Sequence, residues 1–295
     1  MIKSIKYCLI DIVCVIVTYL IAIAVHSIMP SSGGSMDIHA FDSILVNKFG
    51  FSIVASAYFL ILYLHVLLVI KFFASKSILG ARRTGWFYGM AFGLIYMGGM
   101  QEVILSSSPF TDYGIDFIRY QFFIGLGDAI PVIALCVFTC WLYKESISNH
   151  IPKIVINSRE RVVTVGIISI LFFIERTVGY SMGYVASDIS IYPIPTLLWT
   201  FLFGIIIGFA YLLLISTFEN NERIELKLLT AGGILGVNWI WFNCFIGLLF
   251  KNTIVLMLLR SSIDVVAVIA GAIISGFLLN NKGYKKNKNV TMRKQ

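Results

Sequence analysis

The residues best suited to do chemistry in this sequence are polar and ionisable side chains that interrupt long apolar segments. They are Glu102, Asp128, Glu175, Arg176, Asn243 and Asp264. A charge at the centre of a membrane helix costs about 2.5 to 3.5 kcal/mol on insertion, so such groups usually face a bundle interior or a water-filled cavity. We therefore predict that these residues line a substrate or ion pocket.

Asp128 lacks a basic partner on its own helix. The residues three and four positions away are Ile124, Gly125, Pro131 and Val132. A buried carboxylate without a counter-charge is costly, so Asp128 needs either a base from another helix or a proton. Pro131 adds a second feature, because proline removes a backbone hydrogen bond and bends a helix.

Glu175 and Arg176 are neighbours in the segment FFIERTVGY. Adjacent side chains leave a helix about 100° apart, so these two cannot pair cleanly with each other. Each is expected to contact a different neighbouring helix. Arg176 is the natural counter-charge for Asp128 or Glu102, which have no local base, and Asp264 is a third candidate partner.

A structural ion pair is expected within the last apolar segment. Arg260 and Asp264 are four residues apart there. Residues at this spacing share a helix face and lie close enough to pair. Asp264 is therefore a candidate both for the pocket and for a purely structural contact.

Sequence motifs for metal and nucleotide chemistry are lacking. Cys136 and Cys140 lie four apart, but no histidine joins them at ligand spacing. The chain has no zinc-protease motif, no nucleophile-elbow motif and no phosphate-binding glycine loop. We predict neither a metal nor a cofactor, and whether the protein is an enzyme stays open.

The elements that must position these residues are membrane-spanning helices. The chain of 295 residues is 58% hydrophobic and only 13% charged, and apolar runs of about 20 residues are long enough to cross a bilayer. We predict an all-α, polytopic integral membrane bundle of about eight transmembrane helices. They are expected at 8–28, 51–73, 85–105, 120–143, 162–186, 195–217, 228–250 and 254–279.

Charge in the connecting loops predicts the orientation. Lysine and arginine are concentrated in alternate loops and in the tail 280–295, as the positive-inside rule describes for cytoplasmic segments. Both termini are therefore expected in the cytoplasm, with the protein in the plasma membrane. The net charge of +8 is ascribed to contact with anionic membrane lipid rather than with nucleic acid.

Two halves of four helices are expected, 1–143 and 162–279, joined by a cytoplasmic linker at 144–161. DAIPVIALCVFTCWLYK from Asp128 is similar to DVVAVIAGAIISGFLLN from Asp264. Four spans per half would give both halves the same orientation, so the similarity predicts a parallel 4+4 repeat. The sequence is also compatible with a homo-oligomer.

Three functions are consistent with these features. The first is a secondary carrier of a small solute coupled to protons or cations, with Asp128 and Asp264 as ion sites. The second is a membrane-embedded enzyme acting on a lipid or isoprenoid, with Asp128, Glu102 and Glu175 as acid and base and Arg176 binding an anionic headgroup. The third is a non-catalytic accessory or immunity-type protein whose charges lock helices together. The carrier is favoured, because each half contains an acidic group.

Overall fold

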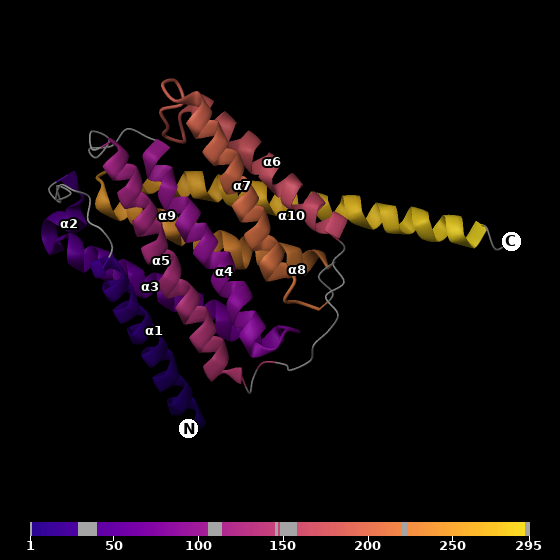
Figure 1. Ribbon diagram of the computed structural model, residues 1–295, viewed down its shortest axis with the longest axis horizontal. Helices are drawn as coiled ribbons and strands as arrows, with labels where there is room; N and C mark the ends of the chain where they lie inside the picture. Colours follow the sequence, from indigo (N-terminus) through magenta and orange to yellow (C-terminus); the bar gives the residue numbers. More distant parts are fainter. Residues whose placement is uncertain are drawn as a thin grey trace.

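The protein forms a bundle of helices in the computed structural model (Figure 1), which describes residues 2–28, 40–105, 114–144, 147, 158–219 and 223–292, with side chains between 9 and 279. The α-helices are α1 (Ile2–Ile28), α2 (Ile44–Phe49), α3 (Phe51–Phe73), α4 (Ala81–Met100), α5 (Gly114–Leu142), α6 (Ser158–Met182), α7 (Pro193–Ile215), α8 (Ile224–Leu228), α9 (Val237–Leu249) and α10 (Ile254–Met292). Short 3₁₀ turns, η2 (Ala74–Lys76) and η3 (Gln101–Leu105), follow α3 and α4, and a π-helical stretch, η6 (Leu229–Gly236), joins α8 to α9.

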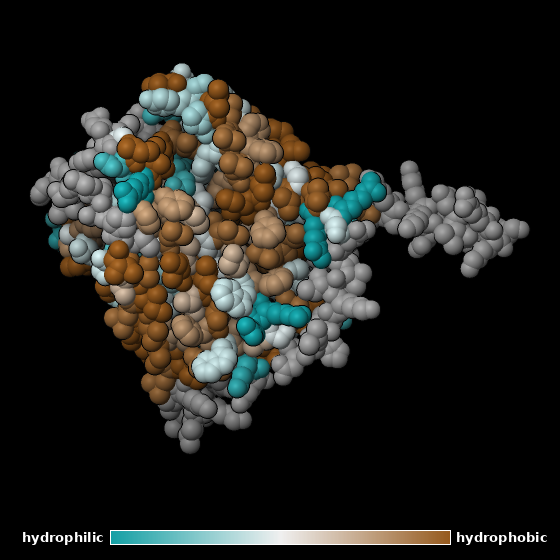
Figure 2. All heavy atoms as spheres, viewed as in Figure 1, coloured by the Kyte–Doolittle hydropathy of each residue, from teal (hydrophilic) through white to brown (hydrophobic). Residues whose placement is uncertain are grey.

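Seven helical segments of the described chain are long and apolar enough to cross a membrane. They are Leu9–Ile28, Phe51–Lys76, Gly114–Leu142, Ser158–Met182, Pro193–Ile215, Ile224–Leu249 and Ile254–Leu279. Hydrophobic side chains also cover most of the face in Figure 2, and hydrophilic ones gather towards the two ends of α4 and α5. The prediction of an all-α, multi-pass helical bundle is confirmed at this level.

The difference from the eight expected spans lies at α4, which corresponds to the segment 85–105. The helix α4 contains Arg82, Arg83 and several glycines, which make it less apolar than the seven other segments. Its aromatic residues Tyr88 and Phe92 are fully buried. α4 contacts α5 and α7 within the bundle, so much of its surface meets protein rather than lipid and needs fewer apolar side chains.

Small residues allow the central helices to approach closely. A Cβ atom on Gly85 would lie 2.9 Å from the Cα atom of Val137 on α5. On α7, a Cβ atom on Gly204 would lie 3.0 Å from the main-chain oxygen of Ser169 on α6. Backbones at this separation are typical of membrane helix pairs that pack through glycine. These contacts hold α4 against α5 and α6 against α7.

The ends of the chain leave the centre of the bundle. α1 packs at one edge against α5 and α3, and the far part of α10 extends beyond the other helices (Figure 1). Most of the predicted linker 144–161, namely 145–146 and 148–157, lies outside the described residues. The side chains of the predicted tail 280–295 lie outside them as well.

Candidate functional site

Arg176 is the centre of a buried charged cluster that also contains Glu102, Glu175, Arg260 and Asp264. Its side chain is completely buried on α6. The guanidinium donates from Nε to Oδ1 of Asp264 at 2.5 Å and from Nη2 to Oδ2 at 2.6 Å. Nη1 donates to Oε1 of Glu102. Two parallel bonds to one carboxylate are the strongest geometry available to arginine.

The charged cluster forms at one end of the bundle, because its members come from matching ends of their helices. Glu102 lies in η3, directly after α4. Arg176 precedes the end of α6 by six residues, and Arg260 follows the start of α10 by six. With a rise of 1.5 Å per residue, both lie about 9 Å from that end. The sequence analysis considered Glu102, Asp128 and Asp264 as partners of Arg176, and the structure places Glu102 and Asp264 there.

Arg260 does not form the pair with Asp264 that their spacing suggested. Its Nη1 lies 3.2 Å from Oε1 of Glu102, and its Nη2 donates to the side-chain oxygen of Asn243. Within the described residues, the ion pairs of Asp264 are with Arg176 and not with Arg260. Asp264 is instead bound by Arg176, which comes from another helix, and Arg260 reaches Glu102 and Asn243.

Glu175 lies at the margin of the charged cluster. Its Oε2 is 3.9 Å from Nε of Arg176, too far for a hydrogen bond, and it is buried without a hydrogen-bond partner. Its Oε1 accepts a hydrogen bond from the hydroxyl of Tyr184 at 3.1 Å. Partial burial and the negative charge of Glu175 raise the pKa of Tyr184 to about 12. Tyr184 is therefore a hydroxyl donor at neutral pH.

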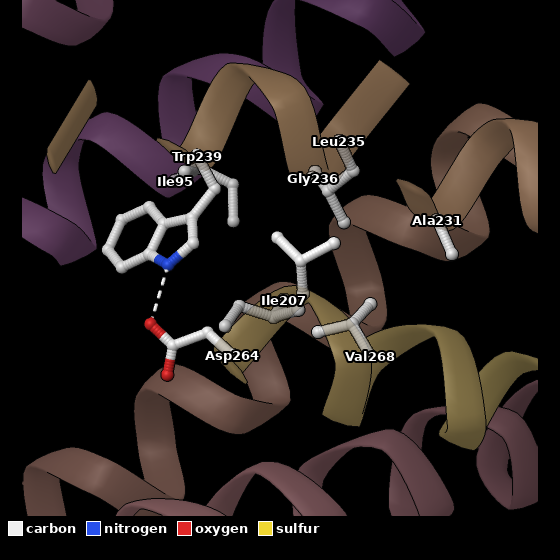
Figure 3. Close-up of a pocket in the computed structure, with 9 residues that line it drawn as sticks. Ile95, Ile207, Ala231, Leu235, Gly236, Trp239, Asp264 and Val268 are labelled. Atoms are coloured by element: carbon white, nitrogen blue, oxygen red, sulfur yellow. Dashed lines mark hydrogen bonds between the residues drawn. The ribbon is translucent and has the colours of Figure 1, made fainter. Parts of the chain in front are cut away.

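Trp239 is a member of the site that sequence reasoning missed. Its indole Nε1 donates to Oδ2 of Asp264 at 2.8 Å (Figure 3). A usable signal was present, because a buried tryptophan usually finds an acceptor for its N–H group.

A small cavity lies beside the carboxylate of Asp264. It measures about 10 Å³, roughly the space of one water molecule. Its lining is apolar apart from Asp264 and includes Ala231, Leu235 and Gly236 of η6, together with Trp239 (Figure 3). The π-helical stretch therefore ends directly against the charged cluster.

Asp128 is not part of the charged cluster. It is buried on α5, with 2% of its surface exposed, and its Oδ1 lies 3.5 Å from Nε2 of His26 on α1. The sequence did not predict a pair between His26 and Asp128. The two sit on helices that are separated by most of the first half of the chain. Their contact could therefore not be read from helical spacing.

In the described part of the chain, no three histidine, cysteine, aspartate or glutamate residues come together as ligands. Cys14, Cys136, Cys140 and Cys244 are free and buried. In the charged cluster, the guanidinium group of Arg176 binds both Glu102 and Asp264.

Comparison with known proteins adds no identity. No family model matches the sequence, no curated protein matches it, and no solved structure matches its fold. Function therefore has to be inferred from the residues of the site.

Proposed function

We propose that the protein is a secondary carrier that couples the movement of a small solute to a proton, with the charged cluster as its coupling site. One observation carries the proposal. Three carboxyl groups, on Glu102, Glu175 and Asp264, face only two guanidinium groups, on Arg176 and Arg260. If all five were ionised, one negative charge would be left uncompensated in a low-dielectric interior, which is costly. One bound proton removes that charge.

Glu175 is the group on which we place this proton. Its Oε2 is the carboxylate oxygen of the charged cluster that is buried without a hydrogen-bond partner among the described residues. A carboxyl group binds a proton on one of its two oxygens, and Oε2 of Glu175 is the oxygen to which we assign it. Tyr184 occupies the other oxygen of Glu175 and lies in the segment that follows α6. The carboxyl group thus lies between the interior of the bundle and the loop at its end.

The element that we expect to move is the π-helical stretch η6 with α9. Alternating access requires a packed element with two arrangements. π-helical turns are rare and frequently occur at functional sites. Here η6 lines the cavity next to Asp264, and Trp239 at the start of α9 binds that carboxylate. A shift of η6 would therefore change the contacts of the coupling site directly.

We further propose that α4 is the eighth span, that both termini are cytoplasmic, that the protein resides in the plasma membrane and that the two halves form a parallel repeat. Helix contacts support the repeat. In the first half, the fourth helix α5 packs against the first and third, α1 and α4. In the second half, α10 packs in the same way against α6 and α9.

A second candidate is a non-catalytic accessory protein in which the charged cluster only locks helices together. The full burial of Arg176 and Asp264 favours it, because a solute site normally leaves some polar atoms accessible. The lipid enzyme has less support. The guanidinium of Arg176 is already bound to Asp264 and Glu102 and has no exposed surface for a headgroup.

Proton-coupled flux in liposomes tests the proposal. The purified full-length protein is reconstituted with an internal pH indicator, and gradients of amino acids, sugars, organic acids and organic cations are applied one class at a time. Wild type is expected to acidify or alkalinise the lumen with one class only. Glu175→Gln should bind the solute yet lose the proton flux, because a carboxamide cannot take up and release a proton.

Glu225→Gln is the matched control. Glu225 is exposed on α8, in a surface pair with Arg223, and its substitution should leave the flux unchanged. Unchanged flux in Glu175→Gln would overturn the assignment of the proton to Glu175. A wild type without solute-dependent proton flux for any class would overturn the carrier and favour the accessory protein.

A further inference from the structure

A second polar site, formed by His26 and Asp128, lies apart from the charged cluster. His26 belongs to the last turn of α1, and Asp128 lies in the middle of α5. Oδ1 of Asp128 is buried without a hydrogen-bond partner among the described residues, although Nε2 of His26 is 3.5 Å away. An unsatisfied carboxylate oxygen next to an imidazole nitrogen raises the question of where the proton is.

The hydrogen-bond partner of Nδ1, the other imidazole nitrogen, shows where one hydrogen of His26 lies. Nδ1 of His26 lies 2.8 Å from the main-chain oxygen of Ala22. A carbonyl oxygen can only accept, so Nδ1 must carry a hydrogen. In a neutral imidazole, Nε2 is then a bare acceptor. It would face a carboxylate oxygen that is also only an acceptor, and this contact is repulsive unless a proton lies on one of the two atoms.

The surroundings of the pair contain phenols rather than further charges. Tyr58 and Tyr63 of α3, Tyr96 of α4 and Tyr120 of α5 lie in the neighbourhood of Asp128. Within the described residues, His26 is the basic side chain that lies within 4 Å of Asp128. His26 keeps 30% of its side-chain surface exposed. A proton can therefore reach the pair from outside the bundle through the imidazole.

We propose that His26 and Asp128 hold one exchangeable proton between them and that this proton-binding site docks the end of α1 onto α5. With the proton bound, an imidazolium faces a carboxylate. Without it, two acceptors face each other inside the protein. The ligand of the site is thus the proton itself. The proposal does not depend on the transport of a solute.

The packing shows why the docking of α1 depends on this contact. The imidazole ring of His26 lies over Gly127, where an added Cβ atom would be 2.8 Å from Nε2. Much of the remaining surface of α1 is exposed, including Leu20 and Ile23. α1 is therefore held at this end by a ring that fits a glycine gap and by one charge contact. Loss of the proton removes the charge contact between His26 and Asp128. Two hydrogen-bond acceptors then face each other and repel.

Solid-state NMR of the full chain in bilayers, with ¹⁵N-labelled histidine, tests the proton. The chain has four histidines, and His26→Gln assigns the signal of His26. The proposal expects an imidazolium at low pH and, above one titration step, a neutral ring protonated on Nδ1. A neutral ring protonated on Nε2 would overturn it, and so would a ring that never changes protonation between about pH 4 and pH 9, a window centred on the usual range of histidine.

The variant Asp128→Asn tests whether the protonation of His26 depends on Asp128 or is that of an ordinary surface histidine. An opposite charge at this distance shifts a titration by about one pH unit or more. At the pH where wild type is half imidazolium, the imidazolium fraction of the variant should therefore fall to about one-tenth. An unchanged fraction would overturn the proposal. His65, which contacts Asn238 on α9 at 3.4 Å, is the internal control and should titrate alike in both proteins.

The same NMR samples measure whether the end of α1 is docked on α5. A cross-peak between the His26 ring and the Cα atom of Gly127 should be strong below the titration step and weaken at least twofold above it. Gly127→Leu, which fills the gap under the ring, should weaken it at every pH. A cross-peak with the same intensity on both sides of the step would overturn the docking role.

Discussion

Replacement of Arg176 by glutamine is the most informative perturbation of the charged cluster. Arg176 makes two hydrogen bonds to Asp264 and one to Glu102, and none of its surface is exposed. Arg176→Gln leaves three carboxyl groups facing the single guanidinium of Arg260. Removal of one partner from a buried ion pair costs about 3 to 5 kcal/mol, because the other charge stays buried. We expect a loss of that size in the free energy of unfolding.

Asp264→Asn is the matched change on the opposite side of the pair. It keeps the shape of the side chain and leaves two carboxyl groups facing two guanidinium groups, so the charges balance. Arg176 also retains Glu102 as a partner. We expect a loss of about 1 to 3 kcal/mol, the usual cost of a weakened buried hydrogen bond. The structure therefore predicts that the arginine substitution is the more damaging of the two.

The double variant completes the cycle. Arg176→Gln with Asp264→Asn should cost less than the sum of the single changes, by about 0.5 to 3 kcal/mol, because the two residues are in direct contact. Unfolding in mixed detergent micelles, followed by circular dichroism and tryptophan fluorescence, measures all four proteins. A wild-type stability for Arg176→Gln, a larger loss for Asp264→Asn, or simple additivity would refute this account of the charged cluster.

Three further substitutions, of which Gly166→Ala is a control, test the packing and the cavity wall by the same unfolding measurement. Gly85→Leu should destabilise by about 1 to 3 kcal/mol, because its Cβ atom would meet the backbone of Val137. Gly166→Ala, with nothing within 4 Å of the new atom, should be neutral or stabilise by up to about 1 kcal/mol; equal losses for the two would contradict the close approach of α4 and α5. Trp239→Phe keeps an aromatic ring but removes the donor to Asp264, and should cost about 1 to 3 kcal/mol. A Trp239→Phe protein as stable as wild type would show that this hydrogen bond is not made.

The sequence alone was sufficient to predict a bundle of helices with several apolar membrane-spanning segments. Apolar segments of about 20 residues are a direct consequence of bilayer thickness, so a helical multi-pass bundle follows from composition and segment length. The segment 85–105 was predicted as a span, yet α4 is not among the seven segments that are long and apolar enough to cross a membrane, because burial against α5 and α7 relaxes the need for apolar side chains. The π-helical stretch η6 was not predicted, since hydrophobic periodicity does not distinguish one widened turn from an ordinary one.

Only the tertiary structure decided which charges meet. Helical spacing gives the angle between two side chains on one helix. Arg176 reaches Glu102 and Asp264 on other helices, as this angle predicted, whereas Glu175 accepts a hydrogen bond from Tyr184 in the segment after its own helix. The same spacing suggested a pair between Arg260 and Asp264, yet the bidentate contact from Arg176 takes that carboxylate.

The partner of Asp128 shows the same limit. Nothing in the sequence links it to His26, which precedes it by about one hundred residues. Partners across helices depend on which faces pack together and at what depth. Polar residues in a membrane segment therefore reveal that a buried site exists, whereas the packing of the helices decides its composition and the number of protons it needs.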